Sequence, residues 1–373
     1  MSASSLSSEI VVIGGGVIGL AVAARVAEDS EVFLVEKFPQ FGRETSSRNS
    51  EVIHSGIYYP EGSNKGAWCI EGRDLLYGYC EQKRVPFKRC GKYVVAVSAS
   101  DEAYLEKLSA HCRKVGVEHR GATGEEIREA EPFVKAVSGI YFPLSGIVDS
   151  HSFMAALERD FIGDGGSPVY CHEVKRIERK DGSWSVTVEG PDGAMEVVAR
   201  RVVNCAGLGA AELSNQALKT KKYAHRFCRG RYFTLASKYK NKFHHLIYPV
   251  PEKDGLGVHV TLDQEGFARL GPDVDWCEKA TYADIESIYD CDWGSLKPAF
   301  LRAAQRYSPD LGEADLSESL IGVRPKLFLE GKAHPDFLVE NHDGFIHCLG
   351  IESPGLTASL RIADEVHRLL AHP

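Results

Sequence analysis

The chain has 373 residues, which is enough for two domains with separate cores. It carries 44 Lys and Arg against 52 Asp and Glu, a formal net charge of -8, and no basic run, which argues against a nucleic-acid-binding protein. Its ten cysteines form no CxxC pair and no zinc-type Cys/His cluster, which favours buried thiols in a reducing compartment.

The N-terminal segment MSASSLSSE is polar and lacks arginine, unlike a signal peptide or a mitochondrial transit peptide. The one long apolar run of the chain follows this segment, but its glycine content argues against a membrane span. We therefore expect a cytoplasmic or mitochondrial protein without a transmembrane segment.

The apolar run from Ile10 to Glu28 predicts a buried parallel strand, a glycine-rich turn and a helix. Gly14, Gly16 and Gly19 follow the strand at GxGxxG spacing, and a second strand ends at Glu36. These glycines permit a tight turn, close approach of a pyrophosphate and close helix packing. The Glu36 carboxylate can accept hydrogen bonds from ribose hydroxyls and would repel the 2′-phosphate of NADP. The pattern predicts a dinucleotide-binding domain without separating FAD from NAD.

A polar, serine-rich loop, Glu44 to Pro60, follows this unit. In a doubly wound fold it leaves the carboxyl end of the second strand, beside the reacting half of a bound dinucleotide. Its hydroxyls and backbone groups can hydrogen-bond a flavin ring. His54 either faces the ring or the substrate, or is a structural histidine bonded to backbone.

The middle of the chain predicts helices over 65–83, 101–115 and 123–130, a strand over 91–98, and a strand, turn and helix over 138–157 capped by Asp149 or Ser150. Strands over 168–203 then break at Gly207 and Gly209, a second place where backbone can approach a cofactor. Within these strands, Val174 is expected to contact an adenine through its backbone.

Short strands with glycine and proline punctuation begin near Lys219 and predict a separate, mainly antiparallel sheet, interrupted by helices over 282–289 and 296–307. The turn GIESPGLTAS then leads into a terminal helix over 356–370, whose N-terminus can again face a ligand. We expect an α/β (α+β) fold: a discontinuous Rossmann-like cofactor domain (1–85, 140–220 and 325–373) and a substrate domain (86–139 and 221–324).

The predicted cofactor contacts come from the four segments described above. They are Gly14, Gly16, Val17, Ile18, Gly19, Glu36, Lys37, Ser46, Ser47, Ser50, Val52, His54, Val174, Ala206, Gly207, Gly350, Ser353, Pro354, Gly355, Leu356 and Thr357.

Nearly the whole chain resembles the D-amino-acid-oxidase-type FAD-dependent oxidoreductases, and within them the L-2-hydroxyglutarate dehydrogenases and oxidases. The resemblance is carried, in the same order, by GGGVIGLAVA, SSRNSEVIHSGIYYP, SGIVDSHSF, VVNCAGLGA, GVHVTLDQEG, LIGVRPK and GIESPGLTAS. It implies FAD, bound non-covalently in an extended form. It also implies oxidation of L-2-hydroxyglutarate to 2-oxoglutarate, with hydride transfer from C2 to flavin N5.

Oxidation of a 2-hydroxy acid needs a base for the hydroxyl proton and a cation for the carboxylate. His259, predicted on a strand beside the flavin, is the first candidate base because a neutral imidazole is available near pH 7; His54 is the second. Arg324, before Pro325, can hold a carboxylate bidentately, as the resemblance also implies. A dicarboxylate needs a second anchor, for which the candidates are Lys326, Arg48, Tyr58 and Tyr248.

Two other functions fit parts of the pattern: an amine or amino-acid oxidase of the glycine or sarcosine type on the same fold, and an NAD-sensing module without turnover. No haem motif, iron–sulfur spacing or second NAD site is visible, so oxygen, a quinone and a carrier flavoprotein are all open as electron acceptor. A quinone would imply peripheral membrane association.

Overall fold

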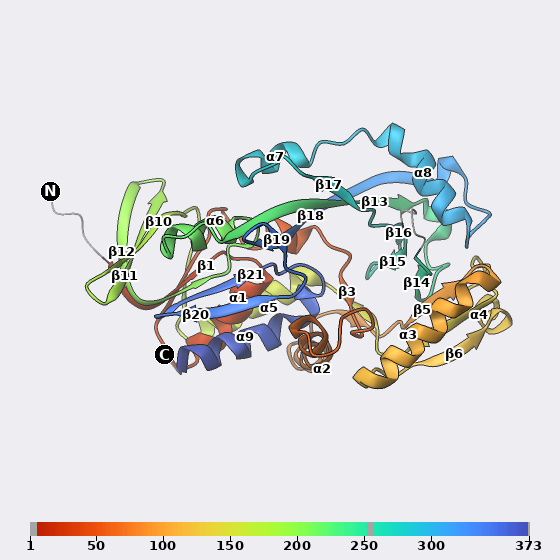
Figure 1. Ribbon diagram of the computed structural model, residues 1–373, viewed down its shortest axis with the longest axis horizontal. Coiled ribbons are helices and arrows are strands. Elements are labelled where there is room, and N and C mark those ends of the chain that lie inside the picture. Colours follow the sequence, from red (N-terminus) through yellow and green to blue (C-terminus); the bar gives the residue numbers. More distant parts are fainter. Residues whose placement is uncertain (1–5, 252–256, 372–373) are drawn as a thin grey trace.

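The computed structural model describes residues 6–251 and 257–371, which form two sheets with helices packed around them (Figure 1). Residues 1–5 of the polar N-terminal segment, and Leu256 of the strand expected around His259, lie outside the described residues. Among the described residues, no helix combines the length and the apolar character needed to cross a bilayer.

The first sheet has eight strands and contains the strand that opens the glycine-rich unit. Its main path is β10 (Glu173–Lys180), β11 (Ser183–Gly190), β12 (Gly193–Asn204), β1 (Leu6–Ile13), β2 (Val32–Val35) and β9 (Ser167–Val169), and β12 also pairs β21 (Phe345–Leu349), which pairs β20 (Leu338–His342). β1 lies between β12 and β2 and runs parallel to both, which is the Rossmann-like arrangement that the sequence predicts.

Helices α1 (Val17–Ala27), α2 (Asn64–Lys83), α5 (Ser150–Gly163) and α9 (Gly355–Ala371) pack against one another along one side of this sheet (Figure 1). α1 is apolar on nearly all sides because it is enclosed by the sheet, α5 and α9. α5 begins at Asp149, whose carboxylate accepts a hydrogen bond from the Ser152 N–H at 2.8 Å, so the predicted cap is confirmed. α6 (Ala210–Ala217) packs against β10, β12 and β21.

The second sheet has ten strands. Its path is β19 (Lys332–Ala333), β18 (Leu316–Leu329), β13 (Tyr223–Leu235), β16 (Ala268–Leu270), β15 (Val260–Leu262), β14 (Leu246–Pro249), β5 (Lys92–Ala96), β7 (Ser138–Phe142) and β6 (Arg120–Thr123), and β17 (Asp275–Cys277) pairs β13. Every pair is antiparallel, as predicted, except β14 with β5, which is parallel.

Helices and a small sheet complete the fold. α3 (Glu102–Val115) and α4 (Gly124–Ala130) pack on the β5–β7 end, and α8 (Trp293–Gln305) packs on β18. β3 (Val52–Ile53), β8 (Gly146–Val148) and β4 (Phe87–Lys88) form a third sheet. The short helices are α7 (Ile285–Ile288), η1 (Thr45–Ser47), η2 (Ala99–Asp101), η3 (Gly207–Gly209), η4 (Ser237–Tyr239), η5 (Tyr282–Asp284) and η6 (Glu313–Asp315).

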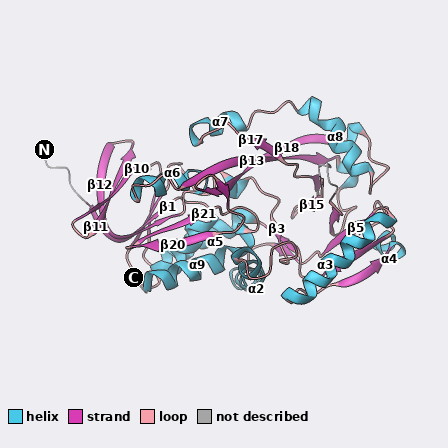
Figure 2. Ribbon diagram, viewed as in Figure 1, coloured by secondary structure: helices cyan, strands magenta, loops and turns pink. Residues whose placement is uncertain are grey.

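The long strands β13 and β18 connect the two halves of the molecule (Figure 2). They pair from Tyr223 opposite Leu329 to Leu235 opposite Leu316, and their two ends belong to different apolar cores. Two of the expected domain boundaries therefore fall inside strands, one within β18 and one within β7. Both strands belong to the second sheet, and one end of the pair packs against α6 and against β21 of the first sheet.

Candidate active site

A cavity of about 1070 Å³ lies where the two halves meet, and it is lined by segments from both. The β1–α1 turn, the end of β2 and the loop before β3 border it, as do β13, β18 and the loop before α9. This volume reaches the upper end of ordinary small-molecule pockets, so the cavity can hold a dinucleotide and a small substrate together.

The β1–α1 turn has the geometry of a pyrophosphate cradle. Gly14 has a φ of +99°, and a Cβ there would approach the Cys205 carbonyl oxygen to 2.6 Å. A Cβ on Gly19 would collide with the Gly14 carbonyl oxygen. α1 therefore starts close against β1 with its N-terminus open to the cavity, and the Val17 N–H there donates to the Ser46 hydroxyl at 2.9 Å.

Glu36, directly after β2, lines the cavity beside this turn. Its side chain is buried, and its two carboxylate oxygens accept hydrogen bonds from the Gly15 N–H at 2.6 Å and the Phe38 N–H at 2.9 Å. Burial raises the pKa of Glu36, while both N–H groups act to lower it. Each carboxylate oxygen can accept a further hydrogen bond, so Glu36 can bind two ribose hydroxyls.

Most predicted cofactor contacts line the cavity. They are Gly14, Gly16, Val17, Ile18, Glu36, Lys37, Ser46, Ser50, Val52, His54, Val174, Ala206, Gly207, Ser353, Pro354, Gly355 and Leu356.

Four predicted cofactor contacts do not line the cavity: Gly19, Ser47, Gly350 and Thr357. The Ser47 hydroxyl donates to the Glu44 carbonyl oxygen at 3.2 Å. The buried Thr357 hydroxyl accepts a hydrogen bond from the His54 N–H at 3.0 Å, which ties the serine-rich loop to the start of α9.

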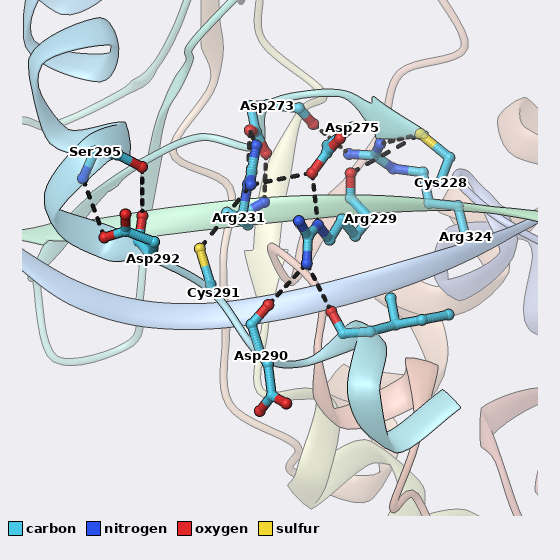
Figure 3. Close-up of polar contacts among 11 residues, drawn as sticks. Cys228, Arg229, Arg231, Asp273, Asp275, Asp290, Cys291, Asp292, Ser295 and Arg324 are labelled. Atoms are coloured by element: carbon cyan, nitrogen blue, oxygen red, sulfur yellow. Dashed lines mark hydrogen bonds and ion pairs between the residues drawn. The ribbon is translucent and has the colours of Figure 1, made fainter. Parts of the chain in front are cut away.

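Arg324, on β18, lines the cavity with its guanidinium free of any carboxylate partner among the described residues. It donates to the Cys228 sulfur at 3.6 Å and to the Asp273 carbonyl oxygen at 3.3 Å (Figure 3). The fully buried Asp273 carboxylate is held instead by Arg231, at 2.9 Å from Nε and 2.5 Å from Nη2. Arg231 thus neutralises Asp273, whose carbonyl contacts Arg324, and leaves Arg324 available to an anion.

The other cations predicted as substrate anchors have partners. The Lys326 ammonium lies 2.8 Å from both oxygens of Glu352, and Lys65 lies 2.9 Å from one of them. Arg48 lines the cavity with its guanidinium 4.2 Å from the Tyr289 ring centroid. Tyr58 also lines the cavity. The charge of Lys326 is therefore compensated within the protein.

Both candidate bases line the cavity. His259 lies one residue before β15 and not within a strand as expected, because the β15–β16 ladder begins at Val260. Its ring stacks on Tyr248 with centroids 3.6 Å apart and planes 9° apart. Burial, with help from Lys92 and Arg324, lowers the pKa of His259 to about 3.

His54 is held from two sides. Its N–H donates to Thr357, and its Nε2 lies 3.2 Å from the Ser353 hydroxyl. Burial, Lys92 and His259 lower its pKa well below the usual value. Both imidazoles are therefore neutral at pH 7 and able to accept a proton.

Sequence reasoning missed several residues here. Tyr59, Lys65, Tyr232 and Glu352 line the cavity, and Lys92 lies fully buried beside it. A signal existed for Lys92, because a lysine directly precedes the apolar run YVVAV. No local signal marks Glu352, whose lysine partners come from distant segments.

Comparison with known proteins identifies the family to which the chain is similar. A family model described as FAD dependent oxidoreductase matches residues 9–369. The chain is 35% identical to the mitochondrial L-2-hydroxyglutarate dehydrogenase of Arabidopsis thaliana, over 96% of this chain and 82% of the relative. It is 30% identical to the L-2-hydroxyglutarate dehydrogenase of Escherichia coli K12, over 97% of this chain and 94% of the relative.

The fold has solved counterparts as well. L-α-glycerophosphate oxidase from Mycoplasma pneumoniae, solved with FAD bound, superposes with a TM-score of 0.88 at 23% identity, over 98% of this chain and 95% of that one. The family resemblance seen in the motifs is confirmed, and FAD is the cofactor of this chain.

The Gly14 turn provides a direct test of the cofactor site. In Gly14→Ala the new methyl group meets the Cys205 carbonyl in a left-handed conformation, so we expect FAD to bind about tenfold more weakly or worse. The ratio of flavin to protein absorbance after purification measures the loss. Gly116→Ala is the matched control, because Gly116 has a φ of +74° with nothing within 4 Å. Full flavin content in Gly14→Ala would contradict the assignment of this turn.

Proposed function

The chain belongs to the FAD-dependent oxidoreductase family, and on that basis we propose that it oxidises L-2-hydroxyglutarate to 2-oxoglutarate. The observation that carries the proposal is that Arg324, which has no carboxylate partner among the described residues, lines the same cavity as the neutral imidazole of His259 and lowers its pKa. The names of relatives similar along nearly their whole length support the same substrate.

Arg324 binds the carboxylate next to the reacting carbon. Its side chain is fixed from behind by Cys228 and by the Asp273 carbonyl, which leaves donors of its planar fork for a ligand. A bidentate pair in a half-buried site fixes the orientation of the hydroxy acid as well as its position.

His259 takes the proton of the C2 hydroxyl. Arg324 is near enough to His259 to act on its pKa, so a carboxylate on Arg324 leaves the adjacent C2 hydroxyl within reach of this ring. Tyr248 holds the imidazole flat against its own ring and so limits its motion. Bound FAD supplies the other half of the chemistry by accepting the two electrons and the hydrogen that leave C2.

The first test is the visible spectrum of the purified protein during anaerobic addition of L-2-hydroxyglutarate. We expect a yellow protein whose flavin absorption bleaches at once, and no bleaching by the D-enantiomer, glycine or sarcosine. Bleaching by glycine or sarcosine alone would overturn the proposal in favour of an amine oxidase. Reoxidation by oxygen, by a soluble quinone or by neither then identifies the class of electron acceptor.

Arg324→Gln tests the carboxylate anchor. Loss of a charge-assisted bidentate pair should raise KM for L-2-hydroxyglutarate by about tenfold to a hundredfold. Steady-state kinetics with an artificial electron acceptor measures the change. Arg226→Gln, which removes an exposed arginine from the neighbouring strand, is the control. An unchanged KM in Arg324→Gln would refute this role.

His259→Gln tests the base. We expect kcat to fall by about 10²–10⁴ while flavin content stays normal. The pH profile is a second readout, since a base must be deprotonated and a pKa of about 3 keeps His259 neutral on the acid side of pH 7. In the wild type kcat/KM should therefore lack the acid limb near pH 6.5 that an ordinary histidine gives. Wild-type turnover in His259→Gln would transfer the role to His54.

A further inference from the structure

Lys92, the first residue of β5, is a buried cation without a counter-ion. Its side chain is fully inaccessible, and its ammonium has no hydrogen-bond acceptor and no carboxylate partner among the described residues. Buried lysines in proteins are normally paired, because removing an ammonium from water is costly. Burial lowers the pKa of Lys92 to about 8, so it still carries its charge at pH 7.

The parallel pairing of β5 with β14 directs Lys92 toward the active site. Lys92 lies opposite Leu246, so Tyr248, two residues further along β14, is its diagonal neighbour on the same face. The ammonium lies 4.1 Å from the centroid of the Tyr248 ring. His259 is stacked on the same ring with centroids 3.6 Å apart, so Tyr248 contacts both the ammonium and the imidazole.

These three residues form a layered stack that ends at the cavity. Tyr248 and His259 line the cavity, whereas Lys92 lies behind them. A tyrosine face attracts a cation but does not replace a carboxylate. Because Lys92 and Tyr248 are buried, the charge of Lys92 is screened less here than it would be in bulk water.

The acids that the structure describes near this wall are paired with cations other than Lys92. Glu352 holds Lys65 and Lys326, and Asp273 holds Arg231. Arg324 in the cavity wall and Lys92 behind it have no acid partner among the described residues, and Arg48, also in the wall, contacts the Tyr289 ring instead of an acid. A ligand with two carboxylates can supply one negative charge to Arg324 and one to Lys92.

We propose that Lys92 is a specificity-determining residue that selects a dicarboxylic 2-hydroxy acid by stabilising the carboxylate remote from the reacting carbon across the Tyr248–His259 stack. This assignment rests on the proposed function. It adds the group that stabilises the second carboxylate of the substrate, which the sequence left open. Lys92 touches neither the reacting atoms nor the cavity surface, so its contribution is to substrate choice.

The test compares Lys92→Met with Lys135→Met, which removes one exposed lysine charge far along the chain. Each variant is assayed with L-2-hydroxyglutarate and with L-2-hydroxyglutaramate, in which a neutral amide replaces the remote carboxylate. We expect Lys92→Met to lose about tenfold or more in kcat/KM for the dicarboxylate and less than about threefold for the amide. Lys135→Met should change neither.

Folding is not expected to obscure this result. Met has about the volume of the apolar part of the Lys side chain and carries no charge. The Lys92→Met protein should therefore bind FAD normally, and its melting temperature should equal or exceed that of the wild type. The readout is the ratio of kcat/KM for the dicarboxylate to kcat/KM for the amide. A general structural defect would lower both values equally and leave this ratio unchanged. Equal losses on both substrates, or no loss on either, would therefore overturn the proposal.

Equilibrium binding keeps the two proposals separate. Glutarate, followed through its perturbation of the flavin spectrum, should bind Lys92→Met about tenfold more weakly than wild type, while butyrate should bind both equally. If wild-type flavin is not reduced by L-2-hydroxyglutarate, the proposed function fails, and glutarate binding still tests Lys92. If reduction occurs and glutarate binds both proteins alike, only the role of Lys92 fails.

Discussion

The close contact between the Gly14 turn and the end of β12 is the constraint on which the rest of the site depends. Only a residue without Cβ can turn there with a φ of +99° against the Cys205 carbonyl. Because the turn is so short, α1 begins next to β1, and its N-terminus opens onto the same cavity as Glu36. α5 and α9 then pack on α1, which fixes the loop before α9 and, through Thr357, the position of His54.

The substrate side is built differently, on two strands that reach across the molecule. β13 carries Arg231 and β18 carries Arg324, and the loop that contains Asp273 lies against both (Figure 3). The Arg231 side chain takes the Asp273 carboxylate and leaves Arg324 only the carbonyl of that residue. A buried acid directly paired with Arg324 would compete with any carboxylate ligand. The buried Arg231–Asp273 ion pair avoids this competition and leaves the Arg324 guanidinium able to bind an anion.

The cofactor half was predictable from sequence because its signals are local. The spacing of Gly14, Gly16 and Gly19 and the acid at the end of the next strand lie within one strand–turn–helix–strand unit. The substrate half depends on tertiary pairing. Lys326 has the chemistry of a carboxylate anchor in sequence, but Glu352 from the loop before α9 already holds it. Lys92 directly precedes an apolar run, but its place beside Tyr248 follows from the parallel pairing of β5 with β14, which no local pattern encodes.

The charges around the cavity explain why a folded protein keeps a cation that its own residues do not neutralise. Lys326 and Lys65 share Glu352, so that part of the wall is balanced without a ligand. Arg324 and Lys92 have no acid partner among the described residues, and an unpaired buried cation lowers the stability of the free protein. Under the proposed function, an anion that enters the cavity regains this free energy on binding, and an acid with two carboxylates regains more of it than an acid with one. In that proposal the free protein is less stable, and the site prefers a doubly charged acid.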